Sequence, residues 1–249
     1  MVLFAGCQSI VKANGQLPVP KDTVIFTFDD GPNPDHDTTS KLLDVLKKHD
    51  IKAVFCLLGE NVEKNPELAR QIYDAGHTVI NHGYSDKWAV NMSGGAFRQN
   101  VEKGDAAITS ALSDPQADRY LDLYNSRFYR PQGGYYKSVH KNIMRNDGYI
   151  LAQATMRPAD AVKNAVQKDE VVRFVVNKIK KQNGGIILLH DGRDGQARLE
   201  RALALYPDGC FNRAWIPGAV DEIILELKKD NFTLNGFDIP AIIKKTAEF

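Results

Sequence analysis

The chain has 249 residues, of which 43% are hydrophobic and 25% are charged, and its formal net charge is +1 at pH 7. This balance is that of a folded globular protein, and it excludes a disordered or fibrous chain. The lysines and arginines are scattered and form no basic stripe with interleaved aromatic residues, so we expect no nucleic-acid partner.

The amino-terminal 21 residues lack any periodic pattern and contain two prolines, which favours a tether ahead of a folded domain over residues 22–249. Residues 3–7 resemble the end of a bacterial lipoprotein signal, in which small residues precede a cysteine that receives lipid. Only six residues precede Cys7 and none is basic, so a signal remnant and a chance match both stay open. The first reading predicts a lipid-anchored or secreted protein of the bacterial cell envelope. No apolar stretch is long enough to span a membrane, so attachment would depend on lipid.

Strand-like and helical patterns alternate along the rest of the chain. Apolar, β-branched runs predict strands, and apolar residues at helical spacing predict helices. In chain order we predict strands at residues 24–28, 51–58, 78–80, 127–130, 149–154 and 185–189, and helices at 38–49, 66–75, 95–112, up to about 146, 169–182 and 221–229. This alternation indicates an α/β fold with a mainly parallel sheet covered by helices, and a closed or nearly closed barrel suits this length.

Polar side chains directly follow several of the predicted strands. They are Asp29 and Asp30, His82, Arg130, and His190 with Asp191. Since the carboxyl ends of parallel barrel strands meet on one face, we expect these residues to converge there. A single such residue would usually be a cap or a turn, but the repetition at four strands favours an active site.

Asp29 and Asp30 are adjacent carboxylates at the tip of an apolar strand, where they repel each other and lose solvation unless a cation lies near. The alternative is a solvated turn. Neighbouring side chains of an extended chain point apart, so one aspartate can bind a metal ion while the other accepts a proton. His82 and Asp86 are four residues apart and can reach one point. Together with Asp30 they would form a three-ligand site that leaves positions for water and substrate.

The segment Thr27-Phe28-Asp29-Asp30-Gly31-Pro32 resembles the signature of the polysaccharide deacetylase family, the NodB-homology or carbohydrate esterase family 4 domain. Residues 76–82, Arg130 with Pro131, and residues 188–191 match further motifs in the family's order. The likeness extends from about residue 22 to 247. It implies a distorted (β/α) barrel of about seven or eight strands that removes acetyl groups from N-acetylglucosamine-type sugars in peptidoglycan, a chitin-like glycan or an exopolysaccharide.

The resemblance also implies a metal-dependent reaction. Asp29 would be the general base, oriented and ionised by Arg130, and Asp30 and His82 would bind one divalent ion. Zinc is the expected ion, although cobalt, nickel, manganese or iron would also fit. Asp86 stands where the family usually has histidine, and we still expect it to bind the metal; its extra negative charge would make bound water less acidic and would favour harder metals.

The remaining implied roles concern the leaving group and the acyl pocket. His190 would protonate the departing amine, Leu188 would line the pocket for the acetyl methyl group, and a backbone N–H near Gly133 would hold the oxyanion. Gln132-Gly133-Gly134 replaces the second proline and the aromatic residue of the third motif. Asp160 is the nearest candidate for the aspartate of the fourth motif, without its tryptophan, and could either pair with His190 or lie on a surface loop.

Two other functions stay open. A protein with this fold could hydrolyse small amides or cyclic imides, or it could be a catalytically silent carbohydrate-binding homologue. The first differs from a glycan deacetylase in having a closed pocket, which would be decided by the loops at residues 91–95 and 114–125. Against the second stands the presence of both a base and an acid, which binding alone does not require.

Overall fold

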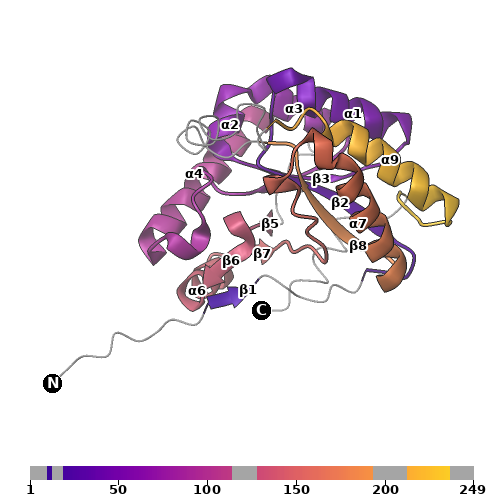
Figure 1. Ribbon diagram of the computed structural model, residues 1–249. Coiled ribbons are helices and arrows are strands. Elements are labelled where there is room, and N and C mark those ends of the chain that lie inside the picture. Colours follow the sequence, from indigo (N-terminus) through magenta and orange to yellow (C-terminus); the bar gives the residue numbers. More distant parts are fainter. Residues whose placement is uncertain (1–9, 13–18, 114–127, 193–211, 236–249) are drawn as a thin grey trace.

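A parallel six-stranded sheet forms the centre of the protein in the computed structural model, which describes residues 10–12, 19–113, 128–192 and 212–235 (Figure 1). In spatial order its strands are β7 (Ile150–Leu151), β5 (Phe128–Tyr129), β4 (Thr78–Asn81), β3 (Val54–Leu57), β2 (Val24–Asp29) and β8 (Gly185–His190). All five neighbouring pairs are parallel. The expected parallel sheet is therefore confirmed, with six strands in it and not seven or eight.

The two edges of this sheet curl toward each other. After β7, Met156 forms an isolated parallel bridge with Ile187 of β8. The amide of Met156 donates to the carbonyl of Ile186 at 3.1 Å, and the amide of Leu188 donates to the carbonyl of Met156 at 3.0 Å. The expected distorted (β/α) barrel is thus confirmed, and it closes through a single bridge where a regular barrel would have a full strand pair.

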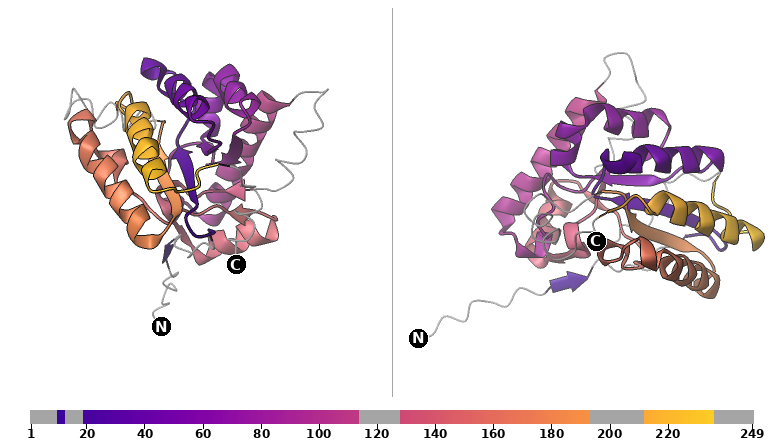
Figure 2. Two further views of the ribbon diagram at one scale, coloured as in Figure 1. Left: turned by 90° about the vertical axis from the view of Figure 1, so that its right-hand side faces the viewer. Right: turned by 45° about the horizontal axis from the view of Figure 1, so that its top comes forward.

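Helices form the outer layer of the barrel (Figures 1 and 2). They are α1 (Thr38–Lys48), α2 (Gly59–Lys64), α3 (Pro66–Asp74), α4 (Gly94–Leu112), α6 (Ser138–Asn146), α7 (Lys168–Gln182) and α9 (Ile216–Lys229). The largest apolar cluster lies between these helices and the sheet and joins Phe26, Leu42, Val175 and Ile224, all fully buried. No helix in the described part of the chain is both long and apolar enough to cross a lipid bilayer.

Strand alternation decides which side chains enter the barrel. Along β2, Phe28 packs outward against the helices, whereas Ile25 packs inside with Leu188 of β8. Because successive side chains of a strand point to opposite faces, the odd-numbered Asp29 also points inside. On β8 the same rule places His190 on the interior side with Leu188. The sequence of these strands therefore directs the predicted catalytic groups into one space.

Some short elements lie outside the predicted pattern, and one predicted strand begins later than expected. Strand β1 (Ile10–Lys12) pairs antiparallel with β6 (Tyr135–Lys137), so part of the segment expected to be a tether contacts the domain. Helix α2 follows β3 directly and is too short to show a helical period. Strand β3 begins at Val54 and not at residue 51, because the amide of Ile51 caps α1 by donating to the carbonyl of Leu46 at 2.9 Å.

Candidate active site

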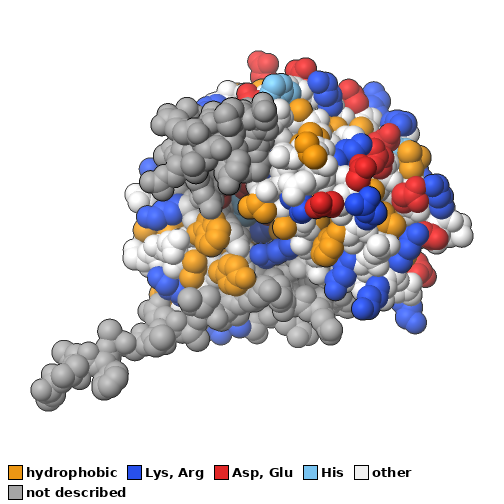
Figure 3. Space-filling view, in the orientation of Figure 1, with side chains coloured by type: hydrophobic (Ala, Val, Ile, Leu, Met, Phe, Trp, Pro, Cys, Tyr) orange, Lys and Arg blue, Asp and Glu red, His pale blue; other side chains and the backbone are white. Residues whose placement is uncertain are grey.

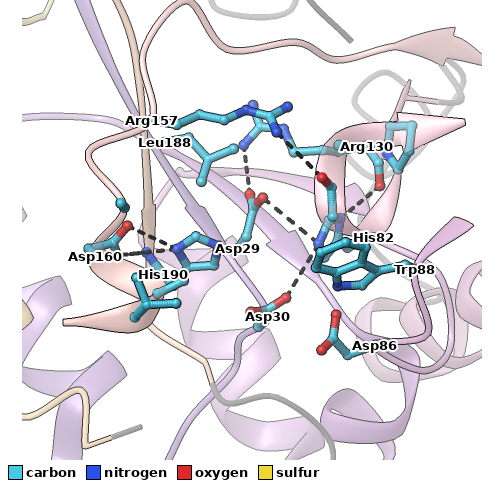
Figure 4. Close-up of a pocket in the computed structure, with 16 residues that line it drawn as sticks. Asp29, Asp30, His82, Asp86, Trp88, Arg130, Arg157, Asp160, Leu188 and His190 are labelled. Atoms are coloured by element: carbon cyan, nitrogen blue, oxygen red, sulfur yellow. Dashed lines mark hydrogen bonds and ion pairs between the residues drawn. The ribbon is translucent and has the colours of Figure 1, made fainter. Parts of the chain in front are cut away.

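One cavity of about 360 Å³ is lined by every residue to which the sequence analysis gave a role in the reaction, whereas Asp191, which was also expected at the strand ends, does not line it (Figure 4). These residues are Asp29, Asp30, His82, Asp86, Arg130, Gly133, Asp160, Leu188 and His190. They come from β2, β4, β5 and β8, from the segments that follow these strands and, for Asp160, from the segment after β7. The volume lies within the range of about 300–1,000 Å³ that is usual for ligand pockets. The structure thus brings these side chains together, as convergence at the strand ends predicts.

Asp29 and Arg130 form a buried ion pair. Arg130 Nη1 donates to Asp29 Oδ1 at 2.6 Å, and each residue is only 3% exposed. Burial alone would raise the pKa of Asp29, but the charges of Arg130 and His82 lower it to about 2. The carboxylate is therefore ionised at neutral pH and can accept a proton.

His82 is held in one orientation by the backbone. Its Nδ1 lies 2.7 Å from the carbonyl oxygen of Arg130. A carbonyl can only accept, so Nδ1 carries the hydrogen and Nε2 faces Asp30 Oδ1 at 3.3 Å and Asp29 Oδ2 at 3.8 Å. Histidine ligands of metal ions commonly donate their other ring N–H to a carbonyl in this way. The donor set of Asp30 and His82 therefore fits a divalent cation between the two side chains.

Asp86 lines the same cavity on the segment after β4, and Figure 4 places it beside Trp88. Hydrogen bonds from Tyr84 N to Asn100 O (2.9 Å) and from Ser85 N to Asn100 Oδ1 (3.0 Å) fix this segment against α4. Within the described residues, no group of three acidic, histidine or cysteine side chains is arranged so that it could hold a metal ion. Asp86 would therefore have to turn toward Asp30 to complete a three-ligand site.

His190 and Asp160 form a second pair across the cavity. His190 Nδ1 lies 3.1 Å from Asp160 Oδ1, and the amide of His190 donates to Asp160 Oδ2 at 2.7 Å. Burial lowers the pKa of His190, but the charge and hydrogen bond of Asp160 and the charges of Asp30 and Asp29 raise it to about 9. The imidazole is therefore protonated at neutral pH. Asp160 is fully buried, so the surface-loop alternative is wrong.

Two residues of the site, Arg213 and Trp88, were not identified by the sequence analysis. Arg213, only 1% exposed, donates to Asp160 O and to Gly192 O at 3.1 Å each and thereby fixes the backbone beside His190. Trp88 is 40% exposed at the cavity and covers Gly133, where an added Cβ atom would lie 2.8 Å from the indole ring. An exposed aromatic ring at a cavity rim suits a sugar face. Neither residue belongs to a strand-end pattern, so only the folded chain identifies it.

Asp191 is a buried carboxyl group close enough to Asp30 and Asp29 for their charges to act on it. It is 0% exposed, and its Oδ2 accepts a hydrogen bond from Thr39 Oγ1 at 2.6 Å, whereas Oδ1 has no partner among the described residues. A Cβ atom on Gly31 would lie 2.7 Å from Oδ2, so glycine is needed there. Burial raises the pKa of Asp191, the Thr39 hydrogen bond opposes this, and the charges of Asp30 and Asp29 add to it, giving about 7.

The raised pKa predicts that Asp191 destabilises the fold as the pH rises. The unfolded pKa is about 3.9, so between about pH 4 and pH 7 the folded protein keeps a proton that the unfolded chain has released. The favourable contribution is complete below this window and is lost across it. As the pH rises from 5 to 8, the free energy of unfolding of Asp191→Asn should therefore increase, relative to that of wild type, by on the order of 2 kcal/mol.

Urea unfolding at both pH values, in chelator to exclude metal ions, measures this change. Asp44→Asn, at an exposed position on α1, is the matched control and should follow the wild-type pH dependence. A constant difference between Asp191→Asn and wild type at the two pH values would contradict the expectation.

Comparisons with known proteins give a consistent result. The model of the family described as polysaccharide deacetylase matches residues 16–152. A peptidoglycan-N-acetylglucosamine deacetylase of Bacillus cereus is 28% identical over 76% of this chain and 82% of its own length. A chitooligosaccharide deacetylase of Rhizobium leguminosarum bv. trifolii is 32% identical over 68% of this chain and 71% of its own length.

Solved structures share the fold. The crystal structure of the Bc1960 peptidoglycan N-acetylglucosamine deacetylase superimposes with a TM-score of 0.71 at 26% identity and covers 96% of both chains. A carbohydrate esterase family 4 pseudoenzyme from Bacillus anthracis superimposes with a TM-score of 0.67 at 21% identity and covers 90% of this chain and 66% of its own. At that identity the pseudoenzyme speaks for the fold alone.

Proposed function

Because the chain belongs to the polysaccharide deacetylase family, we propose that it hydrolyses the N-acetyl group of N-acetylglucosamine-type sugars in a glycan. One observation carries this proposal: an ionised carboxylate, Asp29, and a protonated imidazole, His190, line the same cavity. Amide hydrolysis needs a group that accepts a proton from water and another that donates a proton to the amine. A site that only binds sugar needs neither.

The proposal includes one divalent metal ion, held by Asp30 and His82 with Asp86 as the third ligand. The tautomer of His82, which turns Nε2 toward Asp30, supports this assignment. When bound, such an ion polarises the acyl oxygen and makes water more acidic. Zinc is the ion that we propose, and cobalt, nickel, manganese and iron are its competitors; the two carboxylates shift the preference toward harder ions.

Asp29 accepts a proton from the water that attacks the acyl carbon, and Arg130 keeps its carboxylate oriented and charged. His190 then donates its proton to the sugar nitrogen as the C–N bond breaks, which yields acetate and a free amine. Asp160 holds the imidazole in place through Nδ1, so Nε2 is left to face the substrate. Leu188 lines the cavity from β8, and in this proposal it contacts the acetyl methyl group.

The backbone near Gly133 completes the site as we propose it, with an N–H group directed at the developing oxyanion. Two hydrogen bonds fix this segment: Tyr129 Oη donates to Gln132 Oε1 at 2.8 Å, and Gln132 Nε2 donates to Ser85 O at 3.1 Å. The glutamine that departs from the family pattern therefore ties this wall to the segment before Asp86. This hydrogen bond fixes the position of the Gly133 segment relative to the segment that carries Asp86.

Release of acetate tests the proposal directly. The protein is reconstituted with each candidate metal and incubated with peptidoglycan, chitin oligomers, an acetylated exopolysaccharide, and small amides and cyclic imides. We expect acetate from at least one glycan and none in the presence of chelator. Hydrolysis of the small molecules alone would instead identify a small-amide hydrolase, and glycan binding without acetate release would identify a silent binding protein.

We expect Asp86→Ala to lose metal and activity together. Even residues that only support a metal ligand cost about 10–100-fold in metal affinity or activity, so removal of a ligand should cost at least as much. Metal content after dialysis and acetate release measure the two losses. Asp44→Ala removes an exposed carboxylate from α1 and should retain the metal. An Asp86→Ala protein with both metal and activity would remove Asp86 from the ligand set.

We also propose that the protein acts outside the cytoplasm, at the bacterial cell envelope or as a secreted protein, since the named substrate of one relative is peptidoglycan. Cys7, the candidate for lipid attachment, lies outside the described residues, as does the loop at residues 114–125. Metabolic labelling with a fatty acid, compared between the full chain and Cys7→Ser, tests the anchor. Label that persists in Cys7→Ser would exclude Cys7 as the attachment site.

A further inference from the structure

Arg157 is a cationic side chain in the wall of the active-site cavity that the reaction above does not use. It lies on the segment between Met156, which closes the barrel, and Asp160, which holds His190. In Figure 4 it lies on the same side of Asp29 as Leu188, whereas Asp30 and Asp86 lie on the other side. Arg157 therefore adds positive charge to the part of the cavity away from the proposed metal site.

The hydrogen-bonding capacity of Arg157 is mostly unused. Nη1 donates to the carbonyl of Gly133 at a long 3.5 Å, Nε is buried without a partner, and Nη2 makes no hydrogen bond to the described residues. The carboxylate of Asp29 is already paired with Arg130 at 2.6 Å. No acidic side chain in the described ranges lies within ion-pair distance of Arg157. Among the described residues, the guanidinium is thus a hydrogen-bond donor without an anionic acceptor.

Charge balance makes this position costly. Burial lowers the pKa of Arg157, the charge of Asp29 opposes this, and the nearby charge of Arg130 lowers it further. A partly buried cation without a counter-ion is unfavourable unless a ligand supplies the opposite charge. Two arginines, Arg157 and Arg130, therefore lie near the single negative charge of Asp29, and this wall of the cavity attracts an anion.

The backbone is shaped to admit this guanidinium. Gly134 has a φ of +71°, and a Cβ atom there would lie 2.1 Å from both Nη1 and Nη2 of Arg157. Any other residue at this position would displace the side chain. Gly134 belongs to the segment in which the chain departs from the third family motif. The glycine that departs from the motif therefore leaves the space that Arg157 fills.

We propose that Arg157 binds a carboxylate carried by the glycan, which makes the preferred substrate an acidic N-acetylated sugar polymer. The inference rests on the proposed deacetylase function and names its substrate class. A guanidinium presents a planar fork of N–H donors that matches a carboxylate in two parallel hydrogen bonds. The carboxylate belongs either to a lactyl ether on the reacting sugar or to a uronic acid next to it.

Matched substrates test the preference. The rate constant kcat/KM for acetate release is measured on a neutral N-acetylglucosamine tetramer, on oligomers of equal length that contain a lactyl ether or a uronic acid, and on the methyl esters of both. We expect wild-type protein to favour the acids over their esters. Arg157→Gln should reduce this acid-to-ester ratio by about 10–100-fold, as expected for a charged hydrogen-bonded pair.

Two further variants separate geometry and net charge from folding. Arg157→Lys keeps the charge but loses the fork and should retain an intermediate ratio. Arg145→Gln removes one positive charge from an exposed site on α6 and should keep the wild-type ratio. Thermal unfolding verifies that each variant folds. An acid-to-ester ratio in Arg157→Gln equal to that of wild type would overturn the proposal.

Binding separates this inference from the proposed reaction. Calorimetry with the Asp29→Asn protein measures the affinity for the acids and their esters without turnover, and an added Arg157→Gln substitution should abolish the difference. If no glycan releases acetate but this difference is present and depends on Arg157, the reaction fails and the subsite stands. Acetate also carries a carboxylate: relief of acetate inhibition in Arg157→Gln, with the wild-type acid-to-ester ratio, would assign Arg157 to the product and overturn the proposal.

Discussion

An Asp29→Asn variant should release acetate at least about 10²–10⁴-fold more slowly than wild type while keeping its fold and its metal. The amide of asparagine has nearly the same shape as the carboxylate but cannot accept a proton from water. Asp29 itself, with a pKa of about 2, is ionised at any pH at which the protein would act. The loss should therefore appear in kcat, measured by acetate release.

The buried Arg130 is the main risk to this experiment, because it loses its counter-ion. It keeps other acceptors, however: Thr27 Oγ1 at 2.7 Å, Ala152 O at 3.4 Å and Gln153 O at 3.3 Å. We therefore expect the variant to fold, with a lower midpoint of unfolding that circular dichroism will record. A folded, metal-containing Asp29→Asn protein with wild-type kcat would eliminate Asp29 as the base.

The second large effect concerns the proton donor, His190. Replacement by asparagine should lower kcat by about 10²–10⁴-fold, because the leaving nitrogen would lose the proton donor that we assign to it. A substrate with a leaving group that needs no proton, such as an aryl acetate ester, should lose much less. An equal loss on both substrates would argue that His190 acts in binding or folding and not as an acid.

The pH profile gives an independent view of the same group. The donating form is the imidazolium, so activity should be present below the pKa of His190, about 9, and should fall as the pH rises through it. Asp160→Asn removes the main charge that raises this pKa, so the falling limb should move toward the ordinary histidine value of about 6.5. An unmoved limb in a folded Asp160→Asn protein would separate Asp160 from the titration of His190.

The convergence of the site could be read from the sequence because it depends on local rules. Alternation along β2 and β8 and the common direction of parallel strands are enough to place Asp29 and His190 in one space. Asp86 shows where this reasoning stops. Its spacing from His82 predicts that it reaches the metal, but the segment is set by hydrogen bonds to Asn100 of α4, which spacing does not reveal.

The length of one strand was predicted wrongly for a related reason. Residues 149–154 read as one strand because Ala152 and Ala154 are buried inside the barrel, yet only Ile150 and Leu151 join the ladder as β7. Beyond them the chain leaves β5 and crosses to β8. Burial produces a strand-like pattern whether or not a neighbour pairs with it, so composition cannot distinguish the two cases. Arg157 lies on this crossing segment, and the sequence pattern gave no indication that it lines the cavity.

The crossing has a consequence for how the catalyst is assembled. The barrel closes where Met156 pairs with Ile187, and the proton-donating pair spans this junction. Asp160 comes from the edge that contains Met156, and His190 comes from the edge formed by β8. Arg213 acts as a clasp, with its guanidinium bonded to Asp160 O and Gly192 O on the two sides. Separation of the two edges would part the imidazole from its carboxylate while β2, β3 and β4 remain paired. Activity would therefore be lost before the protein unfolds.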